Sequence, residues 1–142
     1  MRNEQLNISG TYTWNVIDLA SGDIVRSGES RNLIVDVGKD ALAVDLAGGT
    51  DITIDTIKIG TGTTTFTAAS TDLTTEIESK IATVNSSGNQ VSAAALFTFA
   101  SSYQIEEAGL FAGGVAFSLT NGISEDVNST QGLSILWTIT LG

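Results

Sequence analysis

The chain has 142 residues, a length typical of one domain, and a formal net charge of −10 from 16 acidic and 6 basic residues. It contains no cysteine and no histidine, which excludes disulfides, thiolate metal sites and every catalytic arrangement that uses an imidazole. Because phosphate contacts need lysine and arginine, this composition also argues against binding to nucleic acid or to an anionic membrane.

Residues 4–29 predict a β-hairpin. Apolar side chains, among them Leu6, Tyr12 and Trp14, fall on alternate positions of its first half, the pattern of a strand with one buried face. A turn follows at residues 20–23, and Ile24 begins the return strand. We expect the two aromatic rings to anchor the inner face of this sheet.

Residues 32–48 predict a short strand followed by the only helix of the chain, at Val37–Leu46. Gly38, Leu42 and Leu46 recur at a spacing of three to four residues, which is typical of one helix face. Gly48 and Gly49 are expected to end the helix, since glycine takes a positive φ without a clash. We expect the helix to lie across one face or one end of the sheet and to close its core.

Residues 52–141 predict the remaining strands. The isoleucines at 52, 54, 57 and 59 indicate a strand whose register shifts at residues 55–56. A threonine- and glycine-rich loop follows at residues 60–71, with Phe66 as its one apolar anchor. Further strands are expected at residues 76–84, 91–99, 105–111 and 115–119, with a polar loop at residues 120–131.

The last strand alternates apolar residues up to the C-terminus. It is too apolar for an unprotected sheet edge, so we expect it to pair centrally or with another subunit. A possible interface is therefore assigned to Leu133, Ile135, Trp137 and Ile139, together with Phe66. The whole pattern predicts a single, mainly β domain over residues 1–142: an antiparallel β-sandwich or barrel-like domain of about eight strands with one short helix.

No constellation of residues predicts a catalytic site. The glycine-rich segment at residues 60–64 lacks the lysine of a phosphate loop. Glu106 and Glu107 are neighbours on a strand and point to opposite faces; we expect one of them to point inward and bond backbone amides. Two alternatives stay open. The aspartates at 36, 40, 45, 51 and 55 could bind calcium or form a solvated acidic face, and the aromatics Tyr12, Trp14, Tyr103 and Trp137 could bind a glycan or pack in the core.

The N-terminal ten residues contain no apolar segment typical of a secretion signal, and no run approaches the length of a membrane span. We therefore expect the protein to be made and assembled inside a cell without export.

Short motifs follow one another between Asn32 and Phe111. They are NLIV at residues 32–35 with Gly38, IKIGTGTT at 57–64, TDLTTE at 71–76, GNQV at 88–91, FTF at 97–99 and IEEAGLF at 105–111. This succession resembles small virion structural proteins of tailed bacteriophages. One difference is that Ser79 and Lys80 stand near the position where those proteins commonly carry an arginine.

The resemblance implies a non-enzymatic virion protein without a cofactor, made in the host cytoplasm. The first expectation is a capsid decoration or cement protein that binds the outer surface of the shell, with the major capsid protein as its partner. The alternative is a tail component, such as a fibre adaptor or a baseplate-proximal protein, and a third reading is a carbohydrate-binding module that uses Tyr12, Trp14 or Tyr103. A homo-oligomer, most simply a trimer, is expected from the multi-copy role.

Overall fold

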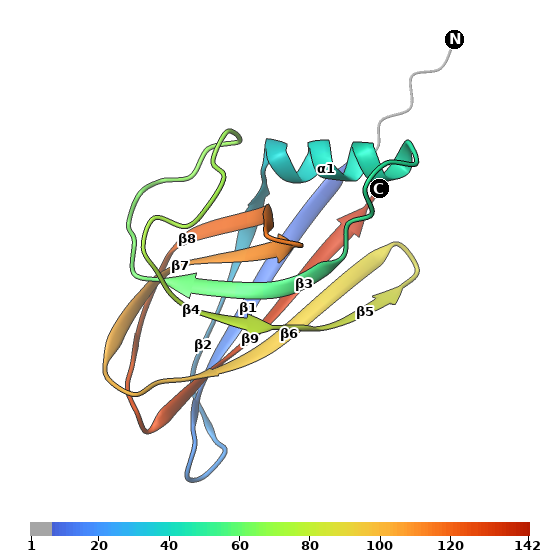
Figure 1. Ribbon diagram of the computed structural model, residues 1–142. Helices are drawn as coiled ribbons and strands as arrows, with labels where there is room; N and C mark the ends of the chain where they lie inside the picture. The colour runs from blue at the N-terminus through green and yellow to red at the C-terminus, as the bar shows by residue number, and fades with distance from the viewer. Residues whose placement is uncertain (1–6) are drawn as a thin grey trace.

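The computed structural model describes residues 7–142 (Figure 1); the first residues of the predicted hairpin, 4–6, lie outside this range. Within residues 7–142, nine strands form one antiparallel sheet, accompanied by one helix. The elements are β1 (Ile8–Asp18), β2 (Ile24–Ile34), α1 (Asp36–Leu46), β3 (Ile54–Gly60), β4 (Glu76–Ile81), β5 (Thr83–Ser87), β6 (Gln90–Thr98), β7 (Tyr103–Ala112), β8 (Val115–Val127) and β9 (Gln131–Leu141).

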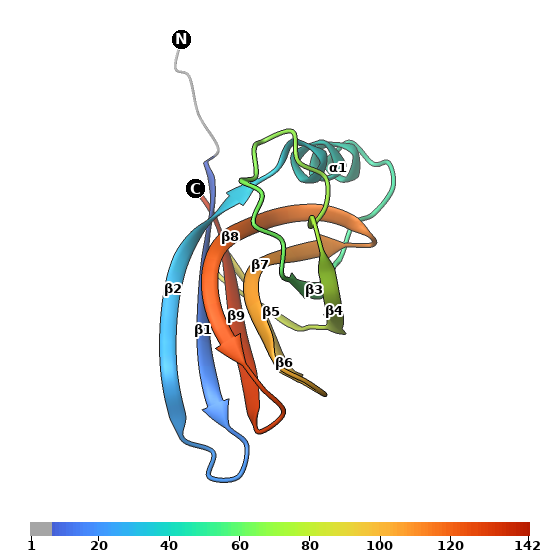
Figure 2. The same ribbon diagram turned by 90° about the vertical axis from the view of Figure 1, so that its left-hand side faces the viewer.

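The sheet curls into a nearly closed barrel, with the strand order β4-β3-β7-β8-β2-β1-β9-β6-β5 (Figures 1 and 2). Its two end strands, β4 and β5, are consecutive in the chain and are separated only by Ala82. The amide of Ala82 donates to the carbonyl of Asp55 at 2.8 Å. One extended stretch thus pairs with β3 through its first half and with β6 through its second half, so it joins the two ends of the sheet. Of the two predicted architectures, the barrel is the one adopted.

The core fills the barrel with the inward-facing residues of every strand. Tyr12 lies opposite Trp137, which lies opposite Ala93, and all three are buried. The rings of Tyr12 and Trp137 meet edge to face with centroids 4.8 Å apart, a favourable aromatic geometry. Strand β9 is central, between β1 and β6, which is the first of the two alternatives that its apolar sequence left open.

Helix α1 covers one end of the barrel, beside β8 (Figure 1). Its close approach depends on Gly38: a Cβ there would lie 2.7 Å from the Cα of Phe117. Leu42 packs against the barrel core, whereas Leu46 is 76% exposed. The apolar stripe therefore ends one turn earlier than its spacing predicted. Gly48, with φ of 85°, follows the helix as expected.

The polar loop predicted at residues 120–131 is wrong, because β8 continues to Val127 and pairs with β7 along most of its length. Gly122 and Ser124 both have positive φ, and the pairing register shifts beside them, between Ile105 and Glu107. This irregularity interrupts the two-residue alternation that marks a strand. The register shift predicted at residues 55–56 of β3 is confirmed.

A second, smaller apolar cluster lies apart from the barrel core. It includes Leu73, Phe111 and Leu119, and Phe66 of the long loop packs against it. The loop between β3 and β4 thus has an apolar anchor of its own, as the sequence predicted.

Candidate functional site

The motifs that carry the resemblance meet at one buried carboxylate. Glu107 is fully buried, and its Oε2 accepts hydrogen bonds from the amides of Gly62 at 3.0 Å and Thr75 at 2.7 Å. Its Oε1 accepts from the amide of Thr74 at 2.8 Å. The carboxylate of Glu107 therefore connects the glycine-rich, Leu-Thr-Thr-Glu and Glu-Ala-Gly motifs through hydrogen bonds. The prediction that one glutamate of the pair bonds backbone amides is confirmed.

The glycines of this structure leave room for the carboxylate. A Cβ on Gly60 would lie 2.3 Å from the carbonyl oxygen of Thr75, and a Cβ on Gly62 would lie 2.6 Å from the Cβ of Thr74. The Thr75 carbonyl is part of the backbone and the Thr74 Cβ is attached directly to it, so neither atom can move aside cheaply and both positions need glycine. The arrangement holds both ends of the loop at residues 61–75, so its role is structural rather than catalytic: both carboxylate oxygens are already bonded and hidden from solvent.

The loop is also fixed to the end of the barrel that carries α1. The amide of Asp36 donates to the carbonyl of Ala68 at 2.8 Å, and the side-chain amide of Asn121 donates to the carbonyl of Thr64 at 2.8 Å. Glu106, on the opposite face of β7, accepts instead from the hydroxyl of Ser124. The two adjacent glutamates thus have separate partners and cannot act as a catalytic pair.

Asn32, the first residue of the NLIV motif, joins three strands besides its own. In the amide orientation that satisfies both ends of the side chain, its nitrogen donates to the carbonyl of Gly10 at 3.2 Å and to the hydroxyl of Ser118 at 3.0 Å, while its oxygen accepts from the indole of Trp137. Like Glu107, this residue satisfies buried polar groups and so specifies the fold.

The four β9 residues predicted as an interface do not lie on the surface. Leu133, Ile135, Trp137 and Ile139 are at most 2% exposed and fill the barrel interior. Phe66 is half-buried against the second cluster of the same chain. The four β9 side chains are therefore unavailable to a partner, and the interface assignment is wrong for them; the assignment of Phe66 stays a prediction. The sequence reasoning correctly placed a strand with one apolar face, but the monomer itself covers that face.

The outer surface of β9 and of the strands β1, β6 and β5 beside it is the candidate functional site. None of the outward-facing residues of β1, β9, β6 and β5 is charged. We call this surface the uncharged face; it consists of Ser9, Thr11, Thr13, Asn15, Ile17, Thr83, Asn85, Ser87, Gln90, Ser92, Ala94, Leu96, Thr98, Gly132, Ser134, Leu136, Thr138 and Thr140.

Charged residues lie at the border of the uncharged face. On the neighbouring strand β2, Arg31 lies opposite Thr11, and Glu29 lies opposite Thr13. At the centre of the uncharged face, the half-exposed Leu136 lies opposite Ala94. With strands about 4.8 Å apart and about 3.4 Å per residue, the four strands cover roughly 500–600 Å². That is most of the roughly 800 Å² that each partner contributes to an interface of standard size.

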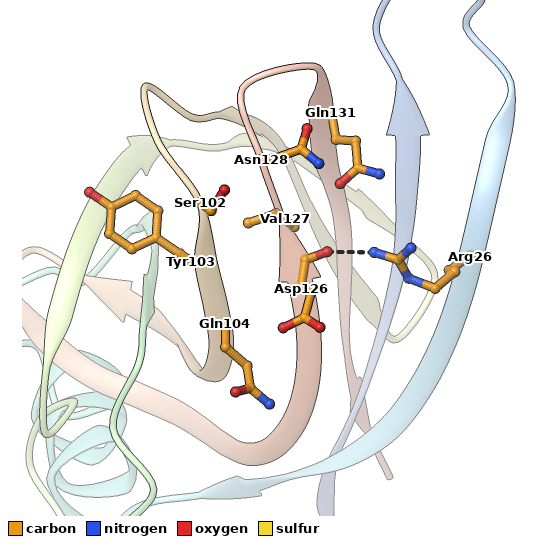
Figure 3. Close-up of a pocket in the computed structure, with 8 residues that line it drawn as sticks. All are labelled: Arg26, Ser102, Tyr103, Gln104, Asp126, Val127, Asn128 and Gln131. Carbon is orange, nitrogen blue, oxygen red and sulfur yellow. Dashed lines mark hydrogen bonds between the residues drawn. The ribbon is translucent and has the colours of Figure 1, made fainter.

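A polar hollow of about 400 Å³ lies at the end of the barrel away from α1 (Figure 3). The guanidinium of Arg26 donates to Glu125 at 2.9 Å and to the backbone carbonyl of Asp126, so its charge is already paired. Tyr103 presents a ring at the opposite side of the hollow. Ser102 is the one hydroxyl nucleophile of the lining besides Tyr103, and within residues 7–142 no hydrogen bond joins it to Asp126, the one carboxylate of the lining. The hollow thus lacks a catalytic arrangement.

Of the aromatics considered for glycan binding, Tyr12, Trp14 and Trp137 are buried in the core and Tyr103 is 37% exposed. A single ring remains for stacking on a sugar. In the described residues, no group of three or more acidic side chains is placed to hold a metal ion, so the five aspartates do not converge. No helix within residues 7–142 is long and apolar enough to span a membrane.

Comparison with protein-family models, with curated proteins and with solved structures finds no match to this chain.

Proposed function

We propose that this chain is a non-enzymatic structural protein of a tailed virus that decorates the capsid and binds the outer surface of the shell through the uncharged face. The observation that carries the proposal is the absence of charge from that face in a chain of net charge −10. The resemblance of the motifs at residues 32–111 to small virion proteins supplies the biological setting.

Interface cores are depleted of charged residues, because each charge must lose its hydration when a partner covers it. Small hydroxyl side chains on a regular sheet have few rotamers to lose, and their donors and acceptors can pair with a partner's polar groups. Leu136 and Ala94 give the face an apolar centre, the place where binding energy concentrates. The remaining surface keeps the acidic residues, which maintain solubility before assembly.

A tail component is the second candidate, since the resemblance covers both locations and the uncharged face would serve either partner. The first experiment is quantitative mass spectrometry of purified particles separated into heads and tails. We expect the protein at stoichiometric level on heads. Its presence only on detached tails would contradict the capsid assignment, and its absence from both would contradict a structural role in the virion.

The second experiment tests the surface. Heads stripped of the protein are mixed with the purified wild type, Leu136→Lys or Val25→Lys. Leu136 and Val25 are 45% and 46% exposed strand residues, and Val25 lies on β2, outside the uncharged face. We expect Leu136→Lys to bind at least about tenfold more weakly and Val25→Lys to bind like the wild type. Equal binding by all three proteins would exclude the uncharged face as the contact.

A further inference from the structure

An apolar cavity of about 220 Å³ lies at the end of the barrel that α1 covers. Figure 1 shows the helix passing over this end, beside the C-terminal end of β9. The cavity opens to solvent, because Val84 is 37% exposed and Ile52, Ile54 and Leu141 are half-buried. Most of its lining is aliphatic or aromatic: Leu42, Ile52, Ile54, Val84, Val91, Phe117, Ile139 and Leu141.

The size of this cavity suits one small organic molecule. Mouths of β-barrels are common ligand sites, and an apolar cavity of about 150 Å³ can take up benzene. A cavity of about 220 Å³ therefore has room for one ring with a short chain attached. Side chains that line an unfilled cavity lack contacts on one side, so a ligand of that shape would gain contact with the walls.

Asp45 adds a carboxylate to this apolar lining, the one charged side chain that residues 7–142 contribute to it. Its Oδ2 accepts from the amide of Ile52 at 3.2 Å, which fixes the side chain beside the cavity. Within the described part of the chain, its Oδ1 accepts no hydrogen bond and the carboxylate joins no ion pair. One carboxylate oxygen is thus free to accept from a ligand.

The charge around the cavity favours a cation. Asp45 lies in the last turn of α1, which has no basic residue, and the carbonyl end of a helix adds partial negative charge. Residues 32–57 contain five aspartates and a single basic residue, Lys39. Three strands of the lining, β5, β6 and β9, carry no charged residue. A negative potential beside apolar walls attracts a cationic ligand and repels an anionic one.

We infer that this cavity binds a small apolar amine, whose hydrocarbon body packs among the aliphatic side chains and whose ammonium group donates to Oδ1 of Asp45. A neutral molecule of the same shape keeps the apolar contacts and loses the ion pair. The site is separate from the uncharged face: Val84 lies opposite the buried Ala93, on the face of β5 away from Thr83 and Asn85. The inference therefore goes beyond the proposed function and does not depend on it.

The test is titration of the purified full chain, followed by calorimetry and by NMR of the side-chain methyl groups. The probes are phenethylamine, the neutral phenethyl alcohol and the anionic phenylacetate. We expect the amine to bind with a dissociation constant of about 1 mM or lower. The alcohol should bind about three- to fivefold more weakly, and phenylacetate more weakly still. The methyl signals of Ile52, Ile54 and Val84 should shift, because these groups line the cavity.

Three variants separate the charge from the apolar contacts. Asp45→Asn keeps an acceptor for the amide of Ile52 and should weaken amine binding to the level of the alcohol, without changing alcohol binding. The matched control is Asp40→Asn, at an exposed position of α1 outside the lining, which should bind all three probes like the wild type. Val84→Phe fills the cavity from β5 and should block the amine and the alcohol; Val91→Phe does the same from β6 if the first variant does not fold.

A wild type that does not bind the amine overturns the inference, as does phenylacetate binding as tightly as the amine. Equal weakening by Asp40→Asn and Asp45→Asn would show that no particular carboxylate holds the ammonium group, and would overturn it too. If Leu6→Ser bound the amine and the wild type did not, the cavity would belong to the chain's own N-terminal residues. Amine binding and binding to heads are measured separately, so each can fail without the other.

Discussion

The bonds to Glu107 lead to a quantitative prediction about stability. Glu107→Ala leaves three backbone donors without their acceptor: that of Gly62 in a buried position, and those of Thr74 and Thr75 in partly exposed ones. A hydrogen bond to a charged group contributes about 1.5–3 kcal/mol, and water can replace part of it at exposed donors. We therefore expect the free energy of unfolding to fall by about 3–5 kcal/mol, a large part of the roughly 5–15 kcal/mol that a domain possesses.

Glu107→Gln separates the bonds from the shape of the side chain. The amide oxygen can keep the two bonds made by Oε2, but its NH₂ group then faces the amide of Thr74, donor against donor. The expected loss is about 1.5–3 kcal/mol. Glu106→Gln is the matched control, because that side chain lies on the other face and accepts only from Ser124; it should change stability by less than about 0.5 kcal/mol.

The assay is urea unfolding followed by tryptophan fluorescence, together with thermal unfolding. For a chain of this length, a loss of 3–5 kcal/mol lowers Tm by roughly 10–20 °C. A selective rise in hydrogen exchange at Gly62, Thr74 and Thr75 would show that the loop ends are released. If both Glu107 variants unfolded within about 0.5 kcal/mol of the wild type, the carboxylate would not hold the loop and the reasoning would be refuted.

Three other perturbations test the core and the loop. Burial raises the pKa of Tyr12 far above its usual value, and its hydroxyl has no hydrogen-bond partner among residues 7–142; Tyr12→Phe should therefore leave stability at pH 7 unchanged or slightly higher. The folded protein keeps this phenol protonated above pH 10, whereas the phenol ionises in the unfolded chain. The free energy of unfolding of the wild type should therefore fall by up to about 1.4 kcal/mol per pH unit above pH 10, relative to that of Tyr12→Phe, in urea titrations. If the free energies of unfolding of the two proteins changed with pH in parallel, the burial of the group would be contradicted. Gly62→Ala places a Cβ 2.7 Å from Oε2 of Glu107 and should lower the free energy of unfolding by about 1–3 kcal/mol, measured by thermal unfolding; an unchanged Tm would show that the loop yields freely. Deletion of residues 132–142 removes most of a central strand and should abolish folding, which circular dichroism would detect; a folded truncated chain would show that β9 is dispensable.

Local patterns were enough to predict most elements of the fold. A strand with one buried face shows alternating apolar and polar residues in its own sequence, so β1, β6 and β9 could be recognised residue by residue. The end of α1 just before Gly48 and the shift at residues 55–56 also depend on nearby residues alone. The inward glutamate followed from two facts that need no tertiary structure: neighbours on a strand face opposite ways, and a buried carboxylate needs donors.

Pairing, in contrast, was decided only by the tertiary structure. The apolar residues of β9 fit either a core or a subunit contact, and the choice depends on which strands lie on both sides of it. The full length of β8 could not be predicted, because its irregularity at Gly122 and Ser124 breaks the alternation of apolar and polar residues. Pairing with β7 nevertheless maintains the strand. The uncharged face is built from four strands that are dispersed along the sequence, so each contributes only a few small polar residues. Their common lack of charge becomes visible once the sheet places them side by side, because contact across strands is a property of the fold and not of any one segment.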